Sequence, residues 1–337
     1  MAKIALNFED GVTKIIEGKA GESVADTAYD ARINIPLDCK DGICGICKCK
    51  IKSGSCDLGF YIDDALTEKE AEEGFALACQ MVPKTDMVIE ILASSKACKV
   101  KIESHATTIT DIQFLSSEVV KLTVTEEKGH KFHFLPGQYA NIEIPTSKVV
   151  RAYSFSGVSH NAHTVEFLVR LLPNGAMSNY LRNEAKTGGV LNLMEPFGSF
   201  YLRDITHPTL FFAGGTGIAP FLAMLEKLSK EKKHPASPIH LYYGATTDEN
   251  LVELERLYDY ATQLQLKIFT CVSIEKSAKH AQGFVTQWIN KAHLGKVGYD
   301  IYICGPPPMV EAVKKAVAEE QIVHNHFYEE KFVQSGN

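Results

Sequence analysis

The chain has 337 residues, which is enough for two or three domains. Its hydrophobic fraction of 45% and charged fraction of 23% are those of a folded globular protein and exclude a largely disordered chain. A net charge of −6 argues against a general nucleic-acid-binding protein, and no apolar run approaches the ~18 residues of a membrane-spanning helix. Residues 1–10 lack the apolar core of a signal peptide, so we expect a cytoplasmic protein without nucleic-acid or membrane partners.

Cysteine is concentrated in the first third of the chain. Seven of the nine cysteines precede residue 100, and an odd total without a secretory signal argues against a disulfide framework. Four of them have the spacing C-x4-C-x2-C followed by a fourth cysteine after 31 residues: Cys39, Cys44, Cys47 and Cys79. This is the plant-type spacing of ligands to a 2Fe-2S cluster.

The residues around these cysteines suit a cluster. Gly42 and Gly45 lie between the ligands, where the backbone must pass close to the cluster and where positive φ is easily reached by glycine. A zinc site is the alternative, but such sites usually pair two C-x2-C units and the chain has no second pair. The other three N-terminal cysteines are predicted to be buried small side chains, the first of them an alternative ligand: Cys49, Cys56 and Cys98.

Short alternating strands follow this segment. They are predicted over residues 119–125, 139–144, 164–170 and 190–193. Strands of this length and spacing are typical of a small antiparallel barrel.

Two motifs on the barrel suit a flavin nucleotide. In Arg151-Ala-Tyr-Ser154, the guanidinium can hold a pyrophosphate, Tyr153 can stack on the isoalloxazine ring and Ser154 can bond flavin N5. Gly175-Ala-Met177-Ser178 opens a helix predicted over 178–184, whose first N–H groups can hold a phosphate.

Strands and helices alternate in the last third, which predicts a doubly wound parallel sheet. The strands are predicted over 209–213, 239–245, 266–273 and 299–304, and the helices over 221–230, 250–262 and 308–320. Ligands bind such sheets at the carboxyl ends of the strands.

A glycine-rich turn follows the first of these strands. Its predicted phosphate-binding residues are Gly214, Gly215, Thr216 and Gly217, at a helix start. Pro220 replaces the third glycine of the dinucleotide fingerprint but is well placed in a first helical turn. Asp248, after the second strand, can bond a ribose 2′-hydroxyl and would repel a 2′-phosphate, which favours NADH over NADPH. Helix capping by Thr247 or Asp248 is the alternative.

In this order the motifs resemble the ferredoxin–NADP reductase superfamily, preceded by a plant-type ferredoxin domain. The resemblance implies a β-grasp-like 2Fe-2S domain at 1–98, an antiparallel FAD-binding β-barrel at 99–206 and a doubly wound NAD-binding domain at 207–337, in an α+β and α/β multidomain chain. It places Cys304-Gly305 beside the nicotinamide, the Glu330 carboxylate near it and the Phe332 ring against the flavin. Ser154, Cys304 and Glu330 are the candidate catalytic residues. A buried last strand is the alternative for Glu330 and Phe332.

The three cofactors explain one another. NADH delivers two electrons, a 2Fe-2S cluster takes one at a time, and a flavin connects the two. The domain order resembles reductase components of bacterial aromatic-ring dioxygenases of the benzoate and toluate type, which implies a Rieske-type terminal oxygenase as partner. Reductases of di-iron monooxygenases share the order and stay open, as do a redox sensor and a zinc-binding scaffold.

Overall fold

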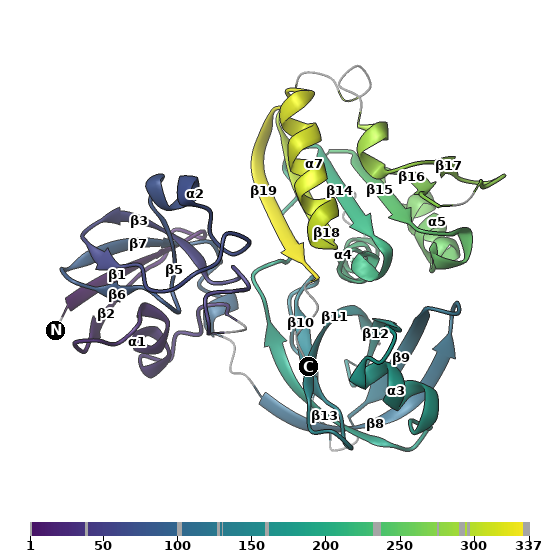
Figure 1. The fold of residues 1–337 in the computed structure, drawn as a ribbon, viewed down its shortest axis with the longest axis horizontal. Helices are drawn as coiled ribbons and strands as arrows, with labels where there is room; N and C mark the ends of the chain where they lie inside the picture. The colour runs from purple at the N-terminus through teal and green to yellow at the C-terminus, as the bar shows by residue number, and fades with distance from the viewer. Residues whose placement is uncertain are drawn as a thin grey trace. The chain divides into compact units, whose positions relative to one another are not determined.

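The computed structural model describes residues 2–37, 40–99, 103–126, 129, 131–158, 162–231, 237–274, 276–289, 294 and 297–332. The chain forms two compact units (Figure 1). The first comprises Met1–Glu103 with Pro196–Ser199, and the second comprises Ser104–Glu195 with Phe200–Asn337. Among the described residues, no helix combines the length and the apolar character required to cross a bilayer.

The first unit is built on a mixed sheet of order β2-β1-β7-β3-β5. Its strands are β1 (Ala2–Phe8), β2 (Thr13–Gly18), β3 (Lys48–Ser53), β5 (Phe75–Leu77) and β7 (Met87–Ile91). The first two strands form an antiparallel hairpin, and β1 pairs in parallel with β7. The remaining elements are α1 (Val24–Asp30), β4 (Cys56–Asp57), α2 (Glu68–Glu72), β6 (Val82–Pro83) and η1 (Ala97–Lys99).

Both helices of this unit have N-caps that the sequence encodes. The Ser23 hydroxyl accepts a hydrogen bond from the Asp26 N–H at the start of α1. Thr67 and Glu70 form a capping box at α2. Each cap satisfies backbone N–H groups that a short helix otherwise leaves without partners. The apolar face of α1 is buried, including Val24 and Ala28.

The second unit begins with a closed six-stranded barrel of order β10-β11-β12-β9-β8-β13. The strands are β8 (Glu103–Phe114), β9 (Val119–Thr125), β10 (Tyr139–Glu143), β11 (Val150–Val158), β12 (Thr164–Arg170) and β13 (Val190–Phe197). Alternate residues of β9, including Leu122 and Val124, point into a core that also holds Phe155 and Phe167. Of the six strands, β8 and β11 were not predicted; β11 carries the Arg151–Ser154 motif, which therefore lies within a strand.

A six-stranded sheet of order β17-β16-β15-β14-β18-β19 follows the barrel, and its pairings are all parallel. The strands are β14 (Thr209–Gly214), β15 (Ile239–Ala245), β16 (Leu266–Val272), β17 (Ala281–Gln282), β18 (Tyr299–Gly305) and β19 (His324–Lys331). The helical elements are η2 (Gly215–Ile218), α4 (Ala219–Lys230), η3 (Asp248–Asn250), α5 (Leu254–Gln263), η4 (Val285–Trp288) and α7 (Pro307–Glu319). The strand order reverses at β14, between β15 and β18, which is the position where such sheets bind nucleotides.

Two predicted helix boundaries were wrong for local reasons. The helix predicted from residue 250 begins at Leu254, because Glu253 has a left-handed φ of 60° that separates η3 from α5. The helix predicted over 178–184 is α3 (Ala176–Asn183), which begins two residues earlier because Gly175 is its N-cap. The predicted three-part fold class is confirmed.

The barrel and the parallel sheet share one hydrophobic core. Val119 and Leu168 of the barrel pack in the same cluster as Phe221 and Leu225 of α4. An ion-pair network extends this contact, since Arg256 of α5 bonds Glu166 of β12 at 3.0 Å and Glu226 of α4 at 3.3 Å. These side chains hold the second unit together as one body.

Candidate functional site

The first part of the site is the cysteine-rich segment before β3. Cys44, Cys47 and Cys79 are described with free thiols, and Cys39 lies outside the described residues. The backbone N–H of Ala78 donates to the Cys47 carbonyl at 3.0 Å, so the segment that carries Cys79 is bonded directly to the one that carries Cys47. The chain thus brings together cysteines that are 32 positions apart.

Two glycines allow the backbone of this segment to adopt its tight turn. Gly42 and Gly45 have φ of +76° and +72°, which other residues rarely adopt. A Cβ on Gly45 would lie 2.9 Å from the Ala65 carbonyl oxygen, and one on Gly42 would clash with the Phe60 carbonyl oxygen. The two glycines therefore let the turn pack closely against the carbonyls of Phe60 and Ala65. Three thiols, with the Gly42 N–H directed at Cys79, are a donor set that fits a 2Fe-2S group.

Thiolate character is favoured at one predicted ligand. A hydrogen bond with Cys47 and another from the backbone N–H of Gly42 lower the pKa of Cys79 to about 7, against the opposing effect of its burial. The hydrogen bond with Cys79 and its own burial raise the pKa of Cys47. Thiolate is the form that binds iron.

The other N-terminal cysteines differ from one another. Burial raises the pKa values of Cys49 and Cys98 to about 12, and the Cys49 thiol donates to the Ala76 carbonyl at 3.4 Å. Both are buried, as predicted, and such thiols are poor ligands and nucleophiles. The prediction was wrong for Cys56, which is only half-buried in the two-residue strand β4.

The second part of the site lies on the barrel. Arg151, Tyr153 and Ser154 follow one another on β11, and Ser154 is buried while Arg151 and Tyr153 are partly exposed. The alternation of a strand sends Arg151 and Tyr153 to one face and Ser154 to the other. The Arg151 guanidinium donates to the Val150 carbonyl at 2.9 Å.

The helix start at Gly175 offers backbone N–H groups, rather than side chains, for binding a phosphate. Met177 and Ser178 are buried, and Met177 packs in the barrel core. The Ser178 hydroxyl accepts a hydrogen bond from the backbone N–H of Leu172 at 2.8 Å, which bends the preceding turn toward α3. A Cβ on Gly175 would lie 2.9 Å from this hydroxyl. A phosphate here would therefore meet the backbone of α3 rather than the Met177 side chain.

The third part is the Gly214–Gly217 turn between β14 and α4. A Cβ on Gly217 would clash with the Cys304 carbonyl oxygen, and a Cβ on Gly214 would clash with the Met309 sulfur. Gly217 therefore allows η2 to approach the end of β18, and Gly214 allows β14 to approach Met309 of α7. Gly215, with φ of +54° and no atom within 4 Å of a built Cβ, faces open space and suits a dinucleotide phosphate.

Asp248 follows β15 and lies, like the glycine turn, at the carboxyl ends of the strands. Its Oδ2 accepts a hydrogen bond from the Ser277 hydroxyl at 2.9 Å. Thr247 precedes η3 without making a side-chain cap hydrogen bond. Ser277 was not predicted, because nothing in the local sequence pairs it with a residue 29 positions away.

Three predicted residues converge where β11, β18 and β19 meet. The Ser154 hydroxyl donates to Glu330 Oε2 at 3.1 Å, and the Cys304 thiol lies 3.7 Å from the same oxygen. Cys304 and Glu330 are register partners on adjacent parallel strands. Burial and the neighbouring Glu330 carboxylate raise the pKa of Cys304, which keeps this thiol neutral.

The end of the last described strand is anchored beside this group. The backbone N–H of Phe332 donates to the Gly305 carbonyl at 2.9 Å, and its ring packs against the hydrophobic core of the second unit. The strand β19 is partly exposed along its length and lies at the edge of the sheet. It is therefore a half-buried strand that also presents Glu330 to the barrel.

Sequence families cover most of the chain. Residues 7–84 match the 2Fe-2S iron-sulfur cluster binding domain, 106–201 the oxidoreductase FAD-binding domain and 211–315 the oxidoreductase NAD-binding domain. The chain therefore has domains for all three predicted cofactors.

Relatives align with nearly the full length. The chain is 45% identical to the toluate 1,2-dioxygenase electron transfer component of Pseudomonas putida, covering 99% of each chain. It is 46% identical to the 2-halobenzoate 1,2-dioxygenase electron transfer component of Burkholderia cepacia, covering 98% of this chain and 97% of the relative. The fold is similar to that of the Amycolatopsis cytochrome P450 reductase GcoB, with a TM-score of 0.74, 24% identity and coverage of 99% and 100%.

Proposed function

Because this chain belongs to the family of aromatic-ring 1,2-dioxygenase electron transfer components, we propose that it passes electrons from NADH through FAD and a 2Fe-2S cluster to a terminal oxygenase. We propose further that this oxygenase is of the Rieske type and acts on a benzoate-like acid. Toluate and 2-halobenzoate, which appear in the names of two relatives, are both substituted benzoates.

The observation that carries this proposal is the meeting of Ser154, Cys304 and Glu330. Ser154 comes from the barrel that matches FAD-binding domains, and Cys304 lies near the carboxyl end of β18 in the sheet that matches NAD-binding domains. Glu330 contacts both. We infer that the two nucleotide sites adjoin here, at a carboxylate, a hydroxyl and a neutral thiol that share one set of contacts.

When bound, FAD accepts two electrons from NADH and releases them singly, and the cluster carries one at a time. The protein's part is to bind and to orient. Ser154 offers a hydroxyl whose hydrogen-bond direction is set by Glu330, and a bound flavin edge can compete for that hydrogen. Glu330 in turn is positioned by the backbone pairing of β19 with β18. Cys304 is small, buried and neutral, so it adds no charge beside a nicotinamide ring.

The remaining predicted residues divide between the two nucleotides. We assign Arg151 and the N–H groups of Met177 and Ser178 to the FAD pyrophosphate, and Tyr153 and Phe332 to the flavin ring. The turn from Gly214 to Gly217, together with Gly305, is assigned to the NADH phosphates and nicotinamide. Asp248, oriented by Ser277, is assigned to the ribose of the adenosine end, which favours NADH.

The cluster ligands complete the assignment. We propose Cys39, Cys44, Cys47 and Cys79 as the four thiolates. Cys44 and Cys47 lie in the turn that contains Gly42 and Gly45, and the Ala78 N–H, next to Cys79, donates to the Cys47 carbonyl. Backbone N–H groups directed toward sulfur, such as that of Gly42 toward Cys79, stabilise the negative charge of the ligands.

An anaerobic titration with NADH tests the whole path. The purified protein is titrated in steps, and its visible spectrum and low-temperature electron paramagnetic resonance spectrum are recorded together. We expect the flavin absorbance to bleach and a rhombic one-electron iron signal to appear. Bleaching without the iron signal would contradict the cluster as the electron exit, and bleaching by NADPH alone would contradict only the role of Asp248.

A reconstitution experiment tests the partner. The reduced protein is mixed with a Rieske oxygenase specific for benzoate or with a di-iron hydroxylase, and oxidation of NADH coupled to product is measured. Turnover with the Rieske oxygenase alone is the expected outcome. Coupled turnover with the di-iron enzyme alone would assign the chain to the reductases of monooxygenases.

A further inference from the structure

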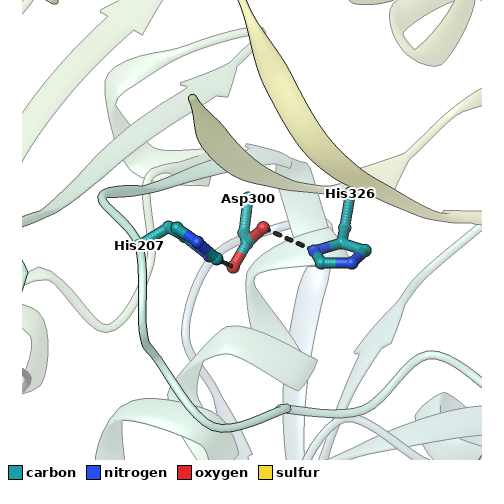
Figure 2. A group of neighbouring side chains, drawn as sticks. All are labelled: His207, Asp300 and His326. Carbon is teal, nitrogen blue, oxygen red and sulfur yellow. Dashed lines mark hydrogen bonds and ion pairs between the residues drawn. The ribbon is translucent and has the colours of Figure 1, made fainter. Parts of the chain in front are cut away.

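Three potential metal ligands converge at the amino end of the parallel sheet. His207 precedes β14, Asp300 is the second residue of β18 and His326 lies in β19 (Figure 2). Nδ1 of His207 lies 3.3 Å from Oδ2 of Asp300, and Nδ1 of His326 lies 2.8 Å from Oδ1. The ligand atoms of the three residues all lie within 4.8 Å of one another.

The backbone holds these residues in place. Asp300 is the register partner of both Thr209 on β14 and His326 on β19. Its own N–H donates to the Pro208 carbonyl at 3.0 Å, which ties the turn that carries His207 to the sheet. Two paired strands and the turn tied to them therefore present the ligands from fixed positions, and ligands on paired strands are better organised than ligands on loops.

The site is open on one side. The Asp300 side chain is only 10% exposed, whereas those of His207 and His326 are 43% and 56% exposed. Figure 2 shows the two rings on either side of the carboxylate, each directing a nitrogen toward it. The hydroxyl of Thr206 also lies 3.1 Å from Nδ1 of His207. An ion could therefore reach this group from solvent, and a water molecule could fill its remaining coordination position.

We propose that His207, Asp300 and His326 are the ligands of a divalent metal ion, and that this ion is Zn²⁺. Two imidazoles and one carboxylate with an open position are a common zinc donor set. Ligand atoms around tetrahedral zinc lie about 3.3 Å apart, which is the separation of His207 Nδ1 from Asp300 Oδ2, while the 2.8 Å between His326 Nδ1 and Oδ1 would have to widen. The exposed rings can turn to adjust the remaining separation. Each Nδ1 binds zinc once its proton has moved to Nε2 or to solvent.

The proposed ion would act away from the redox residues. Asp300 and His326 begin the strand segments that end at Cys304 and Glu330, four residues further on, and four residues of strand span about 13 Å. Zinc would thus join β18, β19 and the turn before β14 at the amino ends of the strands, whereas the nucleotide turns lie at their carboxyl ends. Its expected effect is to brace the strand pair that carries the Cys304–Glu330 contact.

Calorimetric titration of Zn²⁺ into the holoprotein tests the site. We compare the unaltered protein with the double variant His207→Gln/His326→Gln and with the matched control His324→Gln. His324 lies in the same strand and contacts only the Ile322 carbonyl, at 3.4 Å, among the contacts described for its ring nitrogens. We expect one zinc-binding step that the double variant weakens at least tenfold and the control retains.

The zinc K-edge absorption spectrum identifies the ligands. We expect nitrogen and oxygen at about 2.0 Å with imidazole outer shells. Absence of zinc binding, equal binding by the double variant, or a sulfur shell at about 2.3 Å, which would place the ion on cysteines, would each overturn the proposal. The flavin and cluster absorbance of each variant shows that it is folded and loaded.

Discussion

The Ser154 hydroxyl donates a hydrogen bond to Oε2 of Glu330 at 3.1 Å, although 176 positions separate the two residues. The same oxygen lies 3.7 Å from the Cys304 thiol. One carboxylate therefore links the barrel to the parallel sheet at the point where flavin and nicotinamide are expected to meet. The first prediction follows from this link.

Replacement of Glu330 by Gln should slow the reduction of flavin by NADH. The amide keeps the size of the side chain but loses the charge-assisted acceptor, which contributes about 1.5–3 kcal/mol, or roughly 10- to 100-fold in rate if it is used only in the transition state. Stopped-flow absorbance of the flavin measures this rate. The neighbouring Glu329→Gln, which removes an ion pair with Lys314, is the control and should leave the rate unchanged. Equal rates in both variants would show that Glu330 has no role in the reduction of flavin.

Replacement of Cys79 by Ser should remove the cluster while leaving the flavin in place. A serine hydroxyl is not ionised at neutral pH and is a poor iron ligand compared with a thiolate. Iron analysis and the one-electron resonance signal should both fall to background, while NADH still bleaches the flavin.

Two buried cysteines provide the controls for this experiment. Cys98→Ala and Cys49→Ala remove thiols whose pKa values burial raises to about 12. Both variants should retain iron. Loss of iron from Cys49→Ala, with retention in Cys79→Ser, would make Cys49 a ligand instead.

Replacement of Asp248 by Ala should weaken the preference for NADH. The carboxylate, which Ser277 orients, is expected to bond the ribose 2′-hydroxyl and to repel a 2′-phosphate. Loss of one such bond costs about 1.4 kcal/mol or more, so KM for NADH should rise about tenfold while that for NADPH falls. Steady-state reduction of ferricyanide with each nucleotide measures both values. Glu249→Ala is the matched control, since Glu249 bonds Ser117 instead.

Replacement of Arg256 by Met should destabilise the second unit. The guanidinium pairs with Glu166 and Glu226, and its removal would leave these carboxylates facing one another in a partly buried site. Because Arg256 is 22% exposed, we expect a loss of about 2 kcal/mol, less than the 3–5 kcal/mol typical of fully buried pairs.

The fluorescence of Trp288, the only tryptophan in the chain, follows this unfolding in denaturant from within η4. Lys227→Met is the control, because Lys227 forms a more exposed pair with Glu231 and should cost less than about 0.5 kcal/mol. Similar losses in the two variants would show that the Arg256 network contributes no more than a surface pair.

Much of this protein is encoded by short segments. The Cys39–Cys47 spacing, the Arg151–Ser154 motif and the Gly214–Gly217 turn each bring together atoms that lie within a few residues of one another, so their chemistry is readable from the sequence. Short alternating strands likewise predicted the barrel, the succession of strands and helices predicted the parallel sheet, and the matching domains confirm the three cofactors. Strand β11 was missed because glycine and serine interrupt its apolar alternation.

The contacts between distant segments were decided by tertiary structure. Parallel pairing of β18 with β19 places Glu330 beside Cys304, and the same pairing places His326 beside Asp300. Closure of the barrel against α4 brings Ser154 to Glu330, and packing of two turns makes Gly217 necessary opposite the Cys304 carbonyl. The sequence by itself determined which groups are available and what each can bind, because those are local properties. Their partners follow from strand order and register, which depend on the burial of the whole core.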